Sequence, residues 1–324
     1  MDDLKRSALI AVKDCMGLKP GETFLVITDE PLRNIGYALW EAGIGLGAES
    51  MLVEMIPRPG HGQDPPSAVA EMMKMVDVVL CPTSKSLTHT KARREACEAG
   101  ARIGTLPGIT VEVMARTLSA DYHAIADRTR HVCEVVGGGR SVRLTAPNGT
   151  DLTMSIEGRD CIASTGLILN PGDFGNLPSG EAYLAPVEGT ANGVFVVDGS
   201  FAGVGVVEEP LKLEVKDGFV TSISGGEEAE KLRRLLEPHG RDAFNIAELG
   251  IGTNDAAQIS GILLEDEKVA GTVHIAVGNN ASMGGSVTVP VHLDGVIKGP
   301  TLSVDDQVIM KDGKLLISLE RSLT

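Results

Sequence analysis

The first 136 residues repeat a pattern in which apolar runs of strand length alternate with stretches that have helical spacing. Residues 23–28 are almost continuously apolar, which is typical of a strand buried on both faces. Repeated units of this kind predict a parallel sheet covered by helices. The predicted helices are 2–16, 32–42, 67–75, 90–98, 111–118 and 121–136, and the predicted strands are 23–28, 50–56, 76–81 and 102–106.

The pattern changes at the triplet Gly137-Gly138-Gly139, after which most segments have the short spacing of antiparallel strands. Turn sequences separate three pairs of such segments, and a single helix is predicted at 226–236. The chain is therefore predicted to have an α/β fold class, with a parallel-sheet domain at 1–137 and a mainly antiparallel β (α+β) domain at 138–324. The predicted hairpins pair 141–146 with 152–156, 211–215 with 220–223, and 307–310 with 315–319.

The segment 271–295 predicts two strands joined by a polar, glycine-rich connection. Valine and isoleucine alternate with other residues in 273–277, and valines recur at every second position up to the sequence His292-Leu293-Asp294. Because alternate residues of a strand share a face, His292 and Asp294 point in the same direction. Together with His274 on the neighbouring strand, they form a set of ligands suited to a divalent metal ion.

Composition limits the class of partner. The chain of 324 residues carries a formal charge of −15 and only 3% aromatic residues, which argues against nucleic acid as a partner. Residues 1–136 hold 15 basic and 18 acidic residues, which leaves 14 and 26 for the rest, so the second domain carries most of the negative charge. An acidic domain suits divalent cations and amine substrates. The five scattered cysteines and the lack of a membrane-spanning apolar run predict a cytoplasmic protein without disulfides.

Two glutamates extend the candidate metal site. Glu181 enters a predicted strand directly from a loop rich in proline and glycine, and Glu248 lies within the apolar run 246–251. A carboxylate in such a run needs a compensating cation, and Glu248 is predicted to be the most buried of the site carboxylates. With His274, His292 and Asp294 they make three carboxylates and two imidazoles, a set suited to two adjacent divalent ions that activate a water molecule. Either glutamate could then act as the general base.

Four segments in this order resemble a known family: NLPSGEAYLAP, NIAELGIGTN, GTVHIAVG and PVHLDG. They are similar to the M29 metallopeptidases, which are aminopeptidase T-like (leucyl aminopeptidase) enzymes. The resemblance covers about residues 173–300. It implies that Glu181, Glu248, His274, His292 and Asp294 hold two metal ions (Zn, Co or Mn). It also implies a homodimer that removes N-terminal residues from short peptides.

The sequence departs from that family at Ala281, where the peptidases have a tyrosine at the metal centre. The same resemblance extends to iron-dependent dioxygenases that open 2,5-dihydroxypyridine, for which His274, His292 and Asp294 would make a facial triad for Fe(II). A metal-binding homologue without catalysis is a third interpretation. The aminopeptidase is the preferred prediction because a single iron would leave Glu181 and Glu248 without a role as ligands.

Overall fold

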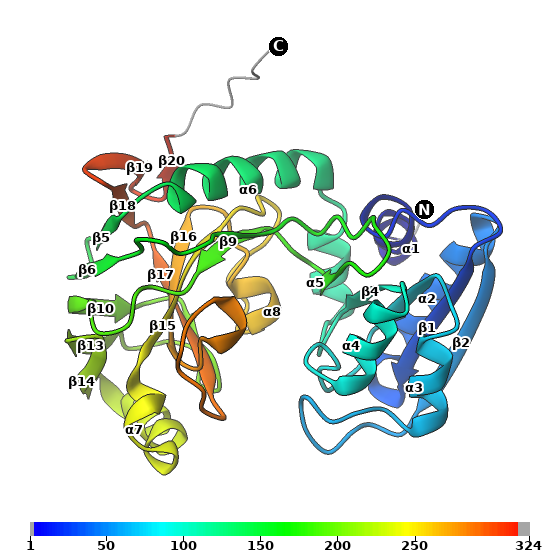
Figure 1. Ribbon diagram of the computed structural model, residues 1–324, viewed down its shortest axis with the longest axis horizontal. Coiled ribbons are helices and arrows are strands. Elements are labelled where there is room, and N and C mark those ends of the chain that lie inside the picture. The colour runs from blue at the N-terminus through cyan, green and yellow to red at the C-terminus, as the bar shows by residue number, and fades with distance from the viewer. Residues whose placement is uncertain (1–2, 317–324) are drawn as a thin grey trace. The chain divides into compact units, whose positions relative to one another are not determined.

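The computed structural model describes residues 3–316, which form two compact units (Figure 1). The first unit is Met1–Ala126 with Thr165–Ser179, and the second is Asp127–Ser164 with Gly180–Thr324. The predicted boundary at 137–138 differs from this division in two ways. The chain passes from the first unit to the second within helix α6 (Tyr122–Gly137), and a later segment returns to the first unit.

The first unit is built on a five-stranded sheet in the order β2-β1-β3-β4-β8, and every neighbouring pair is parallel. The predicted α/β architecture of this part of the chain is confirmed. The strand that the sequence did not indicate is β8, which has three residues and returns from beyond the predicted boundary. The strands are β1 (Thr23–Asp29), β2 (Glu49–Met55), β3 (Val78–Cys81), β4 (Arg102–Thr105) and β8 (Phe174–Asn176).

Helices cover both faces of this sheet, which explains the continuous apolar run of β1. Leu25 and Ile27 belong to one core cluster with residues of α3 (Ser67–Met73) and α4 (Lys91–Glu98). On the other face, the ring of Phe24 lies so close to Gly43 of α2 (Arg33–Gly45) that a Cβ atom at Gly43 would be 2.4 Å from it.

The remaining helical segments of the chain are short. No helix within residues 3–316 is both long and apolar enough to cross a lipid bilayer. The segments are α1 (Asp3–Ile10), which continues as a π-helical turn (Ala11–Cys15), α5 (Val111–Thr117), α7 (Gly226–Leu236), α8 (Leu263–Asp266), and the 3-10 turns Glu30–Leu32, Glu237–His239, Arg241–Phe244 and Ala281–Met283.

The second unit contains two sheets, with strand orders β14-β13-β10-β6-β5-β18-β19-β20 and β12-β11-β17-β16-β15-β9-β7. Their neighbouring strands pair in the antiparallel sense, as the hairpin pattern predicted. The strands of the first are β5 (Ser141–Thr145), β6 (Asp151–Ser155), β10 (Asn192–Val197), β13 (Leu211–Lys216), β14 (Phe219–Ser224), β18 (Thr301–Val304), β19 (Gln307–Lys311) and β20 (Lys314–Leu315). Those of the second are β7 (Ile162–Ser164), β9 (Glu181–Leu184), β11 (Ser200–Phe201), β12 (Gly205–Val206), β15 (Ile246–Gly252), β16 (Thr272–Gly278) and β17 (His292–Lys298).

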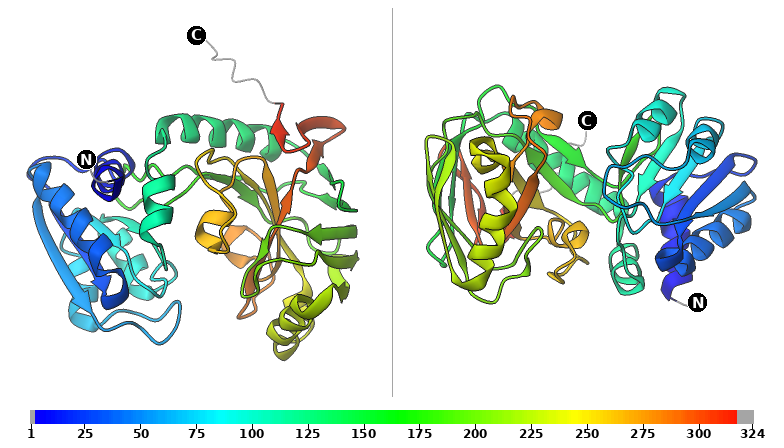
Figure 2. Two further views of the ribbon diagram at one scale, coloured as in Figure 1. Left: turned by 180° about the vertical axis from the view of Figure 1, so that it is seen from behind. Right: turned by 90° about the horizontal axis from the view of Figure 1, so that it is seen from below.

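An apolar core lies between these two sheets. The ribbons of the two sheets can be followed in Figure 2. Leu144 and Phe195 from the eight-stranded sheet belong to the same cluster as Leu249 and Ile275 from the seven-stranded sheet. Strand β13 shows the expected alternation of buried and exposed residues along its length. The seven-stranded sheet therefore packs against the eight-stranded sheet through this core.

One predicted strand needs correction. Residues 287–291 form a loop, and β17 begins only at His292. In this loop, the side chains of Asn279 and Asn280 bind backbone groups that a neighbouring strand would otherwise bind. Asn280 Oδ1 accepts from the Val287 amide at 2.8 Å, and Asn279 Nδ2 donates to the Val289 carbonyl at 3.1 Å. In the last predicted hairpin, β19 and β20 do pair, and residues 317–319 lie outside the described residues.

Candidate metal centre

The five predicted site residues lie on four neighbouring strands of the seven-stranded sheet, β9, β15, β16 and β17. Glu181 begins β9, Glu248 lies in β15, His274 lies in β16, and His292 and Asp294 lie two residues apart at the start of β17. The shared face predicted for His292 and Asp294 follows from this strand geometry. The fold thus brings together all five side chains that the sequence indicated.

Small residues stand opposite each of these side chains. Residues directly paired across antiparallel strands share a face, so a small partner leaves room for the larger group. Gly250 is the tightest case, because a Cβ atom there would lie 1.9 Å from His274 Nε2. Glu181 is paired with Gly252, His274 with Gly250, and His292 with Gly278. Ala276 is paired with Glu248 on one neighbouring strand and with Asp294 on the other.

The two imidazoles meet at Glu248. Its Oε1 is 3.2 Å from His274 Nε2, and its Oε2 is 3.1 Å from His292 Nε2. His292 Nε2 is also 3.4 Å from Asp294 Oδ1, and His274 Nε2 is 3.6 Å from Glu181 Oε2. Glu248 therefore joins the two halves of the cluster, one oxygen to each histidine.

The cluster contains two overlapping groups of three potential ligands, with donor atoms within 4.8 Å of one another. The inner group is Glu181, Glu248 and His274, and the outer group is Glu248, His292 and Asp294. Among the described residues, His274, His292 and Asp294 do not form such a group, in contrast to the predicted facial triad. Glu248 is also not the most buried carboxylate, since its exposed fraction is 6% and that of Asp294 is 4%.

The two groups differ in access. The side chain of His274 is 1% exposed, whereas that of His292 is 30% exposed. His292 Nδ1 lies 2.7 Å from the carbonyl oxygen of Asn279, so this nitrogen donates its hydrogen to the carbonyl. In the neutral imidazole, the lone pair of Nε2 then points toward Glu248 and Asp294, an arrangement that is favourable only with a cation between them. The outer group therefore fits a metal ion.

Without such an ion, protons must balance the charge of the carboxylates. Burial alone would lower the pKa of His274, but the hydrogen bond to Glu248 and the charge of Glu181 outweigh it and raise that pKa to about 9. Burial also opposes ionisation of Glu248, yet the hydrogen bonds to both histidines lower its pKa. A metal ion would replace these protons, because metal ligands must be deprotonated.

Sequence reasoning missed two charged residues of the cluster, Glu267 and Lys268. Lys268 is 1% exposed, and its Nζ is 2.8 Å from Glu181 Oε1 and 2.5 Å from Glu267 Oε2. Burial raises the pKa of Glu267 to about 8. Burial opposes the charge of Lys268, but the carboxylates of Glu181 and Glu267 outweigh it and raise its pKa. Both residues belong to the charged run 265–268, which ends three residues before β16 begins and which a local pattern assigns to the surface.

The loop between β16 and β17 is held by a second set of polar contacts centred on Glu188. Its Oε1 accepts from Asn280 Nδ2 at 2.9 Å and from the Ser286 amide at 2.7 Å, and its Oε2 pairs with Arg159. Arg159 also donates to the Gly284 carbonyl. Ala281, at the position of the family tyrosine, is exposed in this loop. The loop carries the Asn279 carbonyl that orients His292.

Replacing Glu188 with glutamine is expected to lower stability at about pH 7 and to matter less in acid. Burial would raise the pKa of Glu188, but the contacts with Ser286, Asn280 and Arg159 lower it from 4.5 to about 2. A lowered pKa in the folded state stabilises the protein above the unfolded-state value, and this stabilisation is lost as the pH falls through the folded-state value. Urea unfolding midpoints of E188Q and the parent protein should thus differ more at about pH 7 than at about pH 3.

The matched control is Glu214→Gln, which changes an exposed glutamate on β13 whose side chain forms an ion pair with the exposed Lys212. This variant is expected to leave the midpoint unchanged at either pH. A gap between E188Q and the parent protein that stays constant from neutral to acid pH would contradict the proposed role of the Glu188 charge.

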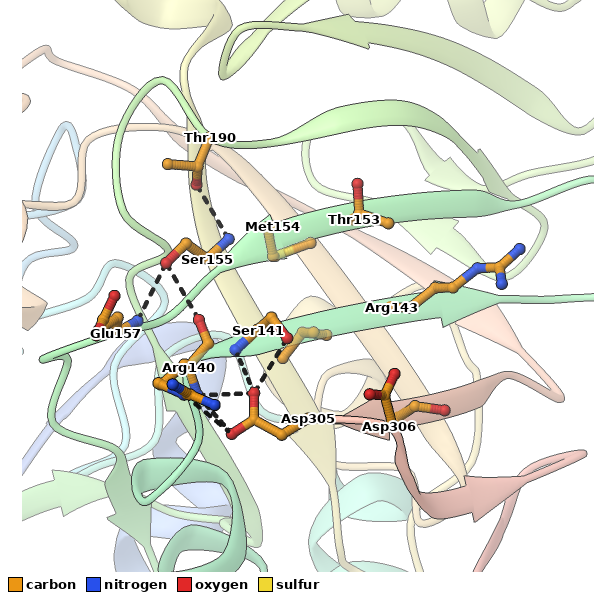
Figure 3. A pocket seen from close by; sticks show the side chains of 12 residues that line it. Arg140, Ser141, Arg143, Thr153, Met154, Ser155, Glu157, Thr190, Asp305 and Asp306 are labelled. Atoms are coloured by element: carbon orange, nitrogen blue, oxygen red, sulfur yellow. Dashed lines mark hydrogen bonds and ion pairs between the residues drawn. The ribbon is translucent and has the colours of Figure 1, made fainter.

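A groove of about 740 Å³ lies elsewhere on the second unit, along β5 and β6 (Figure 3). It is lined by polar side chains and contains none of the five predicted site residues. Its two arginines already have acidic partners, Arg140 with Asp305 and Arg143 with Asp151. The groove is larger than a metal site requires, but both of its arginines are neutralised by these carboxylates. The metal cluster remains the candidate for chemistry.

Comparison with known proteins identifies the family. The family model for 2,5-dihydroxypyridine 5,6-dioxygenase matches residues 11–317. The chain belongs to this family. It is 26% identical over 270 residues to the 2,5-dihydroxypyridine 5,6-dioxygenase of Pseudomonas putida (strain KT2440), covering 77% of this chain and 73% of that protein. The solved structure of 2,5-dihydroxypyridine dioxygenase from Pseudomonas putida KT2440 matches with a TM-score of 0.84 and 21% identity, over 98% of this chain and 99% of that one.

Membership of the dioxygenase family corrects the preferred prediction. The chain was predicted to be a metallo-aminopeptidase, and therefore a hydrolase and protease; this is wrong, because the family model and the similar curated protein are both dioxygenases. The resemblance to M29 proteins holds for the fold. Wild-type AmpT from Thermus thermophilus matches with a TM-score of 0.71 and 18% identity, over 97% of this chain and 99% of that one. The predicted fold class is confirmed.

Proposed function

We propose that this protein is a non-haem, iron-dependent dioxygenase that opens the ring of a dihydroxylated pyridine. The observation that carries the proposal is the outer group of Glu248, His292 and Asp294 in a chain of the 2,5-dihydroxypyridine 5,6-dioxygenase family. One imidazole and two carboxylates are ligands that suit Fe(II) and leave further coordination positions open. The prediction of zinc, cobalt or manganese gives way to ferrous iron in this proposal.

The residues of this chain have separate tasks in the proposed site. Glu248, His292 and Asp294 would hold the iron, and the Asn279 carbonyl fixes the ring orientation of His292 through Nδ1. Ferrous iron supplies the one-electron chemistry that lets dioxygen react with an aromatic ring. The partial exposure of His292 gives the substrate access to this side of the cluster. The buried His274 contacts Oε1 of Glu248 and so holds this carboxylate in position.

The test is to load the purified protein with Fe(II) without oxygen and then add 2,5-dihydroxypyridine with a known amount of dioxygen. We expect oxygen uptake together with loss of the absorbance of the aromatic ring. The same protein loaded with Zn(II) is the matched control and should consume no oxygen, because zinc has no redox chemistry.

The isomeric dihydroxypyridines and dihydroxybenzenes test the substrate class. Turnover of 2,5-dihydroxypyridine well above that of the benzene analogues would support recognition of the ring nitrogen. Protein that binds iron but consumes no oxygen with any of these rings would contradict the proposal, and would favour a metal-binding homologue without this activity.

A further inference from the structure

Lys268 places a fixed positive charge inside the metal cluster. It follows α8 and its side chain is 1% exposed, so its ammonium group is shielded from solvent. The ammonium lies 2.8 Å from Glu181 Oε1 and 2.5 Å from Glu267 Oε2. Two charge-assisted hydrogen bonds of this length tie the lysine to Glu181, a member of the inner group.

The lysine changes what the inner group can bind. Glu181 has one oxygen on the ammonium and the other 3.6 Å from His274 Nε2. A second metal ion held by Glu181 would therefore share a carboxylate with a cation, and the two positive charges would repel each other at short range in a buried place. The outer group differs, because within residues 3–316 neither His292 nor Asp294 forms an ion pair with Lys268. Asp294 is connected to the lysine only through Glu267, whose side chain hydrogen-bonds to it.

We propose that Lys268 takes the place of a second metal ion, so that the cluster holds one divalent ion at Glu248, His292 and Asp294. The inference rests on the metal site of the proposed function and does not depend on ring cleavage. The lysine is a positioning residue, because it acts on the ion through Glu181 and the inner group. It explains how a chain can keep five potential ligands and still bind a single ion.

Metal stoichiometry tests the inference without any turnover. The full-length protein is freed of metal, equilibrated with Zn(II), passed through a desalting column and analysed for zinc per chain. The parent protein should retain about one ion. Lys268→Met removes the charge but keeps a long side chain, and it should retain a second ion, so that the content rises toward about two.

Two control variants separate charge from packing. Lys268→Arg keeps a cation next to Glu181 and should retain about one ion, as the parent protein does. Lys298→Met changes an exposed lysine at the end of β17 and should also leave the content unchanged.

Two results would overturn the inference. The first is about two tightly held ions in the parent protein, a measurement that needs no variant and stands even if Lys268→Met fails to fold. The second is a folded Lys268→Met protein that still retains one. Because zinc content is measured without substrate, a failure of ring cleavage leaves the inference intact. A parent protein that cleaves the ring and retains two ions would contradict the role of Lys268 alone.

Discussion

Glu248→Gln is expected to abolish tight binding of a divalent ion while the fold is retained. Glu248 is the one carboxylate that both ligand groups share, and each of its oxygens faces a histidine nitrogen at 3.1–3.2 Å. Glutamine has nearly the same shape but no charge. Loss of an outer-shell partner of a metal costs roughly 10- to 100-fold in affinity, and loss of a direct ligand should cost more than about 100-fold.

The measurement is a titration of the metal-free protein with Zn(II) and Fe(II), with circular dichroism as the check on folding. His292→Ala and Asp294→Ala should reproduce the loss, since each removes another member of the outer group. Glu214→Gln, on the exposed side of β13, is the matched control and should bind as the parent protein does. Unchanged metal content in a folded Glu248→Gln protein would rule out the proposed ligand set.

Gly250→Ala is expected to damage the site through a single added methyl group. The new Cβ atom would lie 1.9 Å from His274 Nε2 and 2.2 Å from Cε1, so the imidazole must turn away from Glu248. Overpacking of a buried position costs about 1–3 kcal/mol of stability. Because His274 supports Glu248, the affinity for Zn(II) should also fall by roughly 10- to 100-fold.

Thermal unfolding and the same zinc titration would measure both effects. Gly45→Ala is the matched control, because Gly45 ends α2 and a Cβ atom there would meet nothing within 4 Å. This variant should be neutral or stabilising by less than about 1 kcal/mol. A Gly250→Ala protein that keeps both the melting temperature and the zinc affinity of its parent would show that His274 has room to move.

The sequence alone determined the local features of this protein. The continuous apolar run at 23–28 predicts a strand buried on both faces, and the sheet has that strand with helices on each side. The turn sequence between 211–215 and 220–223 predicts a hairpin, as the antiparallel pairing of β13 with β14 confirms. The alternation of faces along a strand placed His292 and Asp294 together. These features follow from the geometry of a single strand or helix, which a short stretch of residues specifies.

Local pattern was insufficient where a segment depends on distant partners. Strand β8 has only three residues and exists because β4 offers it a free edge. Residues 287–291 have the alternation of a strand, but the side chains of Asn279 and Asn280 bind their backbone instead. The five candidate ligands also could not distinguish a peptidase from a dioxygenase, because they suit either reaction class. Comparison with known proteins decided the family.

Only the tertiary structure decided how the site is arranged. Strand register sets Gly250 opposite His274 and Ala276 between Glu248 and Asp294, which gives the ligands their space. Chain folding also brings Lys268 to Glu181, although its own neighbours in sequence suggest an exposed position. Register and charge pairing are properties of segments that meet in space. The sequence therefore identified the residues of the metal centre, and the pairing of four strands determined which of them act together.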